Sequence, residues 1–217
     1  MSETKKRIQT IGEEIANAVS HGVGSLLAVA GTAVLIVFAA IYSDALAVVS
    51  SALYGATLII LYTNSTLYHS ITNKTAKRVF RVFDHCSIFM LILGTYIPVS
   101  LSLLRNWIGW TLFGVNVTCA VVGIVLNSID LERFDRVSQA LYITMGWLVI
   151  ITIYPVIKAV YLRGGIVGLV LLILGGVFYT VGVIFYRSNR KYMHFIWHFF
   201  VLFGSIAHYF FVLFYCI

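Results

Sequence analysis

Seven long apolar runs limit the folds that this chain can adopt. Each run holds roughly 20 residues, and a helix of that length spans the ~30 Å hydrocarbon core of a bilayer. The runs show no alternation of period two, and a backbone surrounded by lipid must satisfy its own amide groups, which favours helices. The sequence therefore predicts an all-α fold, a seven-transmembrane-helix bundle. The predicted spans are 22–42, 46–69, 83–104, 107–127, 138–158, 166–186 and 194–216.

The composition and the loops indicate one integral membrane domain. Hydrophobic residues make up 60% of the chain, charged residues make up 11%, and the mean hydropathy is +0.96. These values are far from those of soluble proteins. The loops are short and contain no Pro-, Gly- or Ser-rich linker and no internal repeat. We therefore expect a cytoplasmic N-terminal segment over 1–21 and a single seven-helix domain over 22–217.

Basic residues lie mostly on one side of the predicted bundle. Twelve of the 15 Lys and Arg residues are in the N-terminal segment and in the second, fourth and sixth loops. They are Lys5, Lys6, Arg7, Lys74, Lys77, Arg78, Arg81, Arg133, Arg136, Arg187, Arg190 and Lys191, whereas Arg105, Lys158 and Arg163 lie on the other side. Because Lys and Arg concentrate in cytoplasmic loops, the N-terminus is predicted to be cytoplasmic and the C-terminus outside.

The same asymmetry accounts for the net charge of +7. The basic loops would face an anionic inner leaflet, which attracts such segments. No basic face carries interleaved aromatic residues, the pattern typical of nucleic-acid binding. We therefore expect a membrane lipid as substrate or ligand and no nucleic-acid partner, and the sequence does not define an oligomeric state.

Polar and ionisable residues gather at the predicted cytoplasmic ends of four helices. The short stretches that carry them are "EEIANAVSH", "STLYH", "FDHCS" and "YMHFIWHFF". They supply Glu14, Asn17, His21, Ser65, His69, Asp84, His85, His194 and His198. Ionisable residues near the hydrocarbon cost about 2.5–3.5 kcal/mol each, and those that persist usually face the bundle interior and pair or bind something. Their convergence at one depth predicts a functional site.

Histidine spacing within this group suggests a metal site. His194 and His198 are four residues apart, so they share one helix face about 6 Å apart along the axis. His69 lies at the same predicted depth and would supply a third nitrogen, with His85 as its replacement if His69 does not bind. Three histidines with an open fourth position are typical of a catalytic zinc site. The alternative interpretation, polar side chains at a membrane interface, stays open for each of them.

His208 is predicted to lie outside this site. It follows His198 by ten residues, which places it roughly 15 Å deeper toward the outer leaflet. One metal ion cannot bind both histidines at that separation. We expect His208 to be an interfacial polar residue or to form an internal hydrogen bond.

The combined motifs resemble those of a known family. They read Glu14-x-x-Asn17-x-x-x-His21, Ser65-x-x-x-His69, Asp84-His85 and His194-x-x-x-His198, in that order along seven spans. This pattern is similar to that of the hemolysin III proteins of bacteria, relatives of the progestin and adipoQ receptors. The resemblance covers the chain from about residue 13 to its end, and it implies a multi-pass protein of the bacterial plasma membrane.

The resemblance also implies a site. It assigns a Zn²⁺ ion to His69, His194 and His198, a hydrogen bond from the zinc-bound water to Asp84, and a place in the same pocket to Ser65. It further places the chain in a wider superfamily with the alkaline ceramidases, which are proposed to be metal-dependent hydrolases within the membrane. Glu14, Asn17, His21 and His85 would surround the metal ligands, or Glu14, Asn17 and His21 would cap and anchor the first helix.

Three functions are compatible with these residues. The first is a zinc-dependent hydrolase of lipid amide or ester bonds, or a regulator of lipid homeostasis, with Asp84 as general base and Ser65 as a hydrogen-bond donor to the oxyanion. The second is a non-catalytic receptor whose zinc only braces the helices. The third is a pore-forming hemolysin, although no predicted span shows the continuous polar stripe of an aqueous channel.

Overall fold

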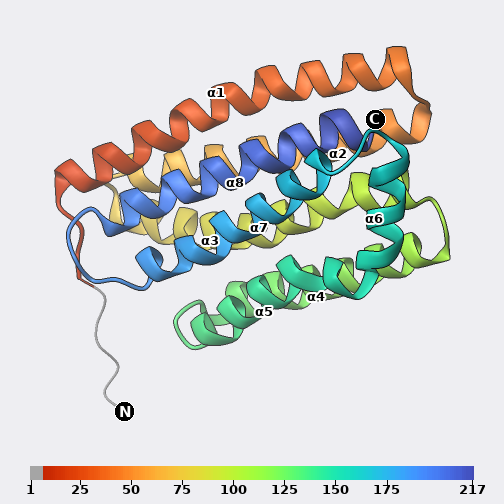
Figure 1. The fold of residues 1–217 in the computed structure, drawn as a ribbon. Coiled ribbons are helices and arrows are strands. Elements are labelled where there is room, and N and C mark those ends of the chain that lie inside the picture. The colour runs from red at the N-terminus through yellow and green to blue at the C-terminus, as the bar shows by residue number, and fades with distance from the viewer. Residues whose placement is uncertain (1–6) are drawn as a thin grey trace.

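Seven apolar helical stretches run side by side through the bundle (Figure 1). The computed structural model describes residues 7–217, so Lys5 and Lys6 of the predicted basic segment lie outside the described residues. Within this range, seven stretches are long and apolar enough to cross a membrane. They are Ile11–Tyr42, Ala45–Ser70, Lys74–Leu104, Trp107–Asp130, Asp135–Leu162, Ile166–Tyr186 and Met193–Tyr215. The predicted all-helical, seven-span architecture is confirmed.

Two of the spans are composite. The helices are α1 (Ile11–Tyr42), α2 (Ala45–Ser70), α3 (Lys74–Ile97), η1 (Pro98–Leu104), α4 (Trp107–Asp130), α5 (Asp135–Trp147), η2 (Leu148–Thr152), α6 (Ile153–Leu162), α7 (Val167–Tyr186) and α8 (Met193–Tyr215). The third span changes from α- to π-helical turns at Pro98, and the fifth contains a 3₁₀ stretch just before Pro155. Proline has no N–H for the helical ladder, which explains why both irregularities lie at the two prolines of the chain.

Polar caps, rather than apolarity, set where the first and third helices begin. α1 begins at Ile11 instead of at 22, because Thr10 and Glu13 form a reciprocal capping box. α3 begins at Lys74 instead of at 83, because the Asn73 side chain accepts hydrogen bonds from two backbone amides. Both helices therefore extend beyond their most apolar residues.

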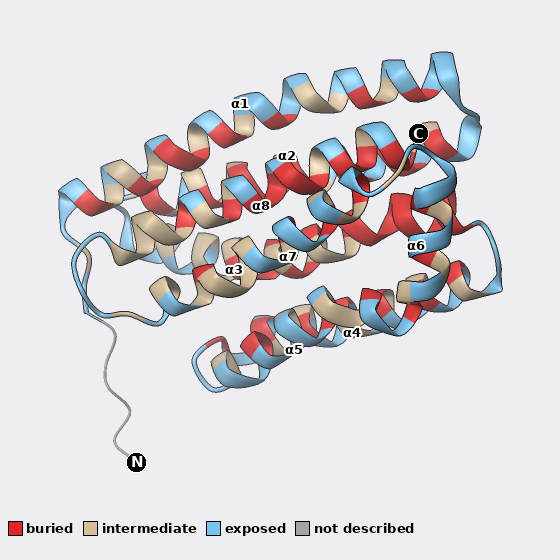
Figure 2. Ribbon diagram, in the orientation of Figure 1, coloured by how far each residue is buried: buried red, intermediate tan, exposed pale blue. Residues whose placement is uncertain are grey.

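The third span lies at the centre of the bundle. In the most apolar 18-residue stretch of this span, 78% of the residues are buried, whereas the corresponding fraction is 17–44% in the other six spans. Figure 2 shows the buried residues on the inward faces of the helices and the exposed residues on their outer faces. Those outer faces carry large apolar side chains such as Leu26, 74% exposed, and Ile184, 68% exposed. An apolar surface of this extent is suited to lipid.

The two ends of the bundle differ in their ion pairs. At the end that holds the C-terminus, Arg105 donates two hydrogen bonds to Asp44, with N···O distances of 2.5 and 2.6 Å. These bonds hold the pKa of Asp44 at about 2, and the same carboxylate caps α2. At the opposite end, where α1 begins, Arg7 pairs with the buried Glu13. The described N-terminal residues and the C-terminus therefore lie at opposite ends (Figure 1).

Small residues allow the helices to approach closely. Gly123 of α4 faces the ring of Phe89 in α3, which is fully buried, and a Cβ atom at Gly123 would overlap that ring. Close approach of backbones at glycine is a common source of packing energy between membrane helices. Gly114 lies on the same helix, but a Cβ atom there would meet no atom within 4 Å.

Gly123→Ala is expected to destabilise the protein, by about 1–3 kcal/mol, because the added methyl group would displace the Phe89 ring. The measurement is thermal unfolding of purified protein in mild detergent. Gly114→Ala is the matched control, and we expect it to unfold at or above the wild-type temperature because alanine is the better helix former. Equal unfolding temperatures for the two variants would contradict this account of the α3–α4 contact.

Candidate metal centre

Three histidines from two helices meet at the end of the bundle where α1 begins. His69 lies in the last turn of α2, and His194 and His198 lie in the first two turns of α8. One ring nitrogen from each lies within 4.8 Å of the others, and the ring centroids are 4.8–5.2 Å apart. Within the described residues, these three histidines form the one group of His, Cys, Asp and Glu side chains whose ligand atoms lie close enough together to hold a metal ion.

The proton position on His69 follows from its partner. Nδ1 of His69 lies 2.7 Å from Oε2 of Glu14, and Lys77 Nζ lies 3.0 Å from the other oxygen of that carboxylate. Since a carboxylate only accepts, Nδ1 carries the hydrogen, and in the neutral imidazole Nε2 keeps its lone pair. Nε2 is buried and has no hydrogen-bond partner within residues 7–217. At metal sites a carboxylate often accepts a hydrogen bond from the imidazole nitrogen that does not bind the metal. This hydrogen bond orients the ring and raises the basicity of the other nitrogen.

His198 is oriented in the same way by a serine. Its Nδ1 lies 3.0 Å from Oγ of Ser20, whose hydroxyl donates to the carbonyl of Asn17 at 2.9 Å. The serine oxygen must then accept from Nδ1–H of His198, which leaves Nε2 of His198 as a lone-pair donor. The structure thus holds two of the three imidazoles in the form that binds metal. This satisfies the chemical requirement for a divalent ion at the site.

His21 stands beside this group. Its ring stacks on that of His198 with centroids 3.5 Å apart and planes 7° apart. The side chain is buried, and neither ring nitrogen has a hydrogen-bond partner in the described part of the chain.

The other predicted site residues divide into two groups. Ser65 and Asp84 line the same cavity as His194 and His198, and both are largely buried. His85 lines this cavity as well, but its nitrogens have other partners: Nδ1 lies 2.8 Å from the carbonyl of Arg81 and Nε2 lies 3.2 Å from the hydroxyl of Tyr186. His69, rather than His85, completes the histidine group.

Two supporting residues were not predicted. Ser20 orients His198, and its signal in the sequence is its position one turn after Asn17. Glu13 accepts the backbone N–H of Tyr192 at 2.8 Å. Tyr192 has a φ of 61°, which is uncommon for a residue other than glycine, and it immediately precedes α8. Glu13 therefore holds the turn that sets the position of His194, and the Thr10-x-x-Glu13 spacing could have indicated it.

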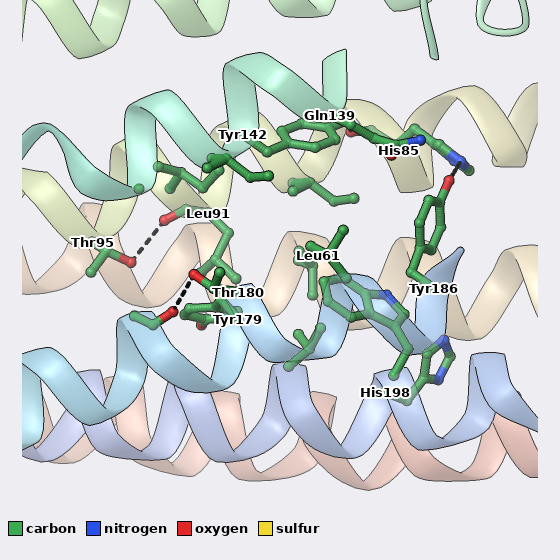
Figure 3. A pocket seen from close by; sticks show the side chains of 18 of the residues that line it. Leu61, His85, Leu91, Thr95, Gln139, Tyr142, Tyr179, Thr180, Tyr186 and His198 are labelled. Atoms are coloured by element: carbon green, nitrogen blue, oxygen red, sulfur yellow. Dashed lines mark hydrogen bonds between the residues drawn. The ribbon is translucent and has the colours of Figure 1, made fainter. Parts of the chain in front are cut away.

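A cavity of about 130 Å³ extends from the histidines into the bundle. Figure 3 shows His198 and Tyr186 at one end and Thr95 toward the other. Polar side chains lie at both ends, because Tyr179 and Thr180 lie near Thr95 (Figure 3), and the lining also includes apolar residues such as Leu61, Leu91 and Val201. We call it the histidine cavity. Its chemistry suits a molecule with a polar head and an apolar chain.

Comparison with known proteins agrees with these residues. The haemolysin-III related family matches residues 9–209. The chain is 44% identical to the Hemolysin-3 homolog of Bacillus subtilis (strain 168) over 209 residues, which cover 96% of each chain. It is 42% identical to Hemolysin-3 of Bacillus cereus over 217 residues, covering 99% of this chain and 97% of the relative.

A more distant similarity reaches animal proteins. The human monocyte to macrophage differentiation factor is 26% identical over 212 residues, covering 93% of this chain and 83% of that protein. The family match spans all seven apolar helical stretches at least in part. It includes His69, His194 and His198, which together we call the metal group. The chain therefore belongs to the haemolysin-III related family, as a multi-pass protein of a bacterial cell membrane.

Proposed function

We propose that the protein is a zinc-dependent membrane hydrolase that cleaves amide or ester bonds of lipids. The observation that carries the proposal is the pair of tautomers: Glu14 and Ser20 leave His69 and His198, in their neutral forms, with unprotonated Nε2 atoms, and His198 lines a largely apolar cavity. Three neutral imidazoles favour zinc among the common divalent ions. The cavity would hold the acyl chain while the scissile bond lies beside the histidines.

The chemistry can be divided among the residues of the site. A Zn²⁺ ion held by the three imidazoles would polarise the scissile carbonyl and acidify the attacking water. The carboxylate of Asp84 would accept the proton from that water and return it to the leaving amine or alcohol. The hydroxyl of Ser65 would donate a hydrogen bond to the developing oxyanion. His21, whose ring stacks on that of His198 in the same cavity, would hold the His198 ring in place.

A second proposal concerns orientation. The basic loops and the histidine group lie at the same end of the bundle, because His69 and His194 adjoin the loops that carry Lys74 and Lys191. Lys and Arg mark the cytoplasmic side, so we place the site at the inner leaflet. A reporter that is active only outside the membrane should be active when fused after Ile217 and inactive when fused before residue 1. The reverse pattern would contradict this orientation.

Metal content is the first test of the proposed function. Elemental analysis of protein purified in mild detergent, without a metal-binding tag, should find about one zinc per chain. The double variant His194→Ala/His198→Ala should contain none. Well-folded wild-type protein without metal would remove the physical basis of the proposal.

The orienting residues give a graded control for this measurement. Glu14→Gln and Ser20→Ala keep all three imidazoles but disturb the partners of His69 and His198, so zinc affinity should fall about 10–100-fold. Competition with a chelator measures this change. Thr10→Ser serves as the matched control on the same segment, because it retains the capping hydroxyl, and its zinc affinity should equal that of the wild type.

Hydrolysis is tested with metal-loaded protein and a panel of lipid amides and esters. Wild-type protein should release fatty acid from at least one member, and Asp84→Asn should reduce the rate about 10²–10⁴-fold with zinc still bound. Gly114→Ala should retain the wild-type rate.

Zinc-loaded protein with no turnover on any lipid would instead indicate that the metal braces α2 and α8. Dye release from liposomes that is unaffected by chelation would favour a pore, although the apolar cavity lining does not resemble an aqueous channel.

A further inference from the structure

Lys77 joins three helices beside the metal group. It lies in the first turn of α3, and its Nζ lies 3.0 Å from Oε1 of Glu14 in α1. The same ammonium group donates a hydrogen bond to the backbone carbonyl of Tyr68 in α2, at 3.0 Å. One side chain therefore ties the carboxylate that contacts His69 to the turn of α2 that carries His69.

The carbonyl that Lys77 contacts lies at the end of its helix. Tyr68 belongs to the last turn of α2, which ends at Ser70, and the last four carbonyls of a helix lack an intrahelical donor. A cation at this end of a helix also interacts favourably with the helix dipole. Nζ of Lys77 lies 5.0 Å from the centre of the Tyr68 ring as well. Lys77 thus contacts both the backbone and the ring of the residue directly before His69.

The carboxylate of Glu14 is divided between two partners. Oε2 lies 2.7 Å from Nδ1 of His69, and Oε1 lies 3.0 Å from Nζ of Lys77. If the carboxylate turned, it would lose one of these two contacts. Lys77 therefore fixes which oxygen of Glu14 meets His69 and from which direction.

The exposure of this ion pair indicates what it contributes. The side chains of Lys77 and Glu14 are 26% and 23% exposed, whereas that of His69 is 1% exposed. An ion pair that water reaches contributes little to folding stability. Its main consequence is geometric, because a long glutamate side chain without a partner samples several rotamers. The pair therefore acts on the orientation of the buried His69 more than on the stability of the fold.

The other basic residues of this segment make no such contact. Lys74 and Arg78 are exposed and form no ion pair within residues 7–217, and Arg81 pairs with Glu132 instead. Of these four basic residues, Lys77 alone reaches Glu14. Lys74, on the same turn of α3, is therefore a matched control for substitutions at Lys77.

We propose that Lys77 is a positioning residue of the metal centre, which orients the Glu14 carboxylate and through it the metal-binding nitrogen of His69. Asp84, the proposed general base, follows Lys77 by seven residues and so lies on the same face of α3, two turns along. α3 would then set the positions of the base and of one metal ligand together. The inference rests on the metal group of the proposed function, and it requires no hydrolysis.

The test is the zinc affinity of protein purified in mild detergent, measured by competition with a chelator. Lys77→Met keeps an apolar stem but removes the ammonium group. We expect it to bind zinc about three- to tenfold more weakly than wild type, a smaller loss than for removal of the carboxylate that touches the ligand. Lys77→Arg restores a charged donor and should bind zinc nearly as tightly as wild type. Lys74→Met should bind zinc as tightly as wild type.

A double variant separates positioning from a merely structural role. If Lys77 acts through the carboxylate, Lys77→Met should cause no further loss of zinc affinity in a Glu14→Ala background. With Co²⁺ in place of zinc, the visible absorption of the ion reports the geometry of its ligands. We expect Lys77→Met to change that spectrum and Lys74→Met to leave it unchanged. Lys77→Gln, which also removes the charge, gives a second substitution if Lys77→Met does not fold, and it should weaken zinc binding as well.

Equal zinc affinities and Co²⁺ spectra for Lys77→Met and wild type would overturn the inference. A loss that persists undiminished in the Glu14→Ala background would overturn it too, and it would indicate that Lys77 only holds the end of α2. Wild-type protein that binds no zinc would overturn both the inference and the proposed function. If zinc binding depends on Lys77 through Glu14 while the protein hydrolyses no lipid, the inference stands and only the proposed hydrolase activity fails.

Discussion

An imidazole inside an apolar bundle has two different nitrogens, and the partner of one determines what the other can do. A carbonyl or carboxylate partner accepts, so it fixes the hydrogen on the nitrogen that it contacts and leaves a lone pair on the other. Glu14 does this to His69, and Ser20 does it to His198 through its own bond to a carbonyl. The rest of the site depends on these contacts, because only unprotonated nitrogens can bind a metal ion.

The fold places these contacts by joining distant parts of the chain. The α1 residues Glu14 and Ser20 reach α2 and α8, and Glu13 of the same helix holds the turn before α8. The buried third span supplies Asp84 from the other side of the cavity. The first turns of α1 are therefore part of the site. This explains why α1 extends to Ile11, well beyond the residues needed to cross the hydrocarbon.

The sequence predicted the seven spans well, because apolarity has a length scale set by the bilayer. The same signal placed the start of α1 too late, since hydrophobicity marks the part of a helix within lipid and caps mark where it begins. For the site, depth arguments brought His69, His194 and His198 together correctly. Depth is one coordinate only, and it could not separate His69 from His85, which face different neighbours at similar depth. Ser20 was missed because its role depends on which way the ring of His198 turns.

His208 shows how the same rule acts in the other half of α8. There the protein again fixes one nitrogen with a backbone carbonyl, but it provides no partner for the second among the described residues. His69, His194 and His198 lie close enough together for the proposed cation to bind all three imidazoles at once. At His208 a single lone pair is buried by the protein, and no cation would bind there, because one neutral ligand cannot offset the cost of burying a charge. The two parts of α8 therefore differ in the number of imidazoles that converge, and only the part near His69 has the geometry to hold a metal ion.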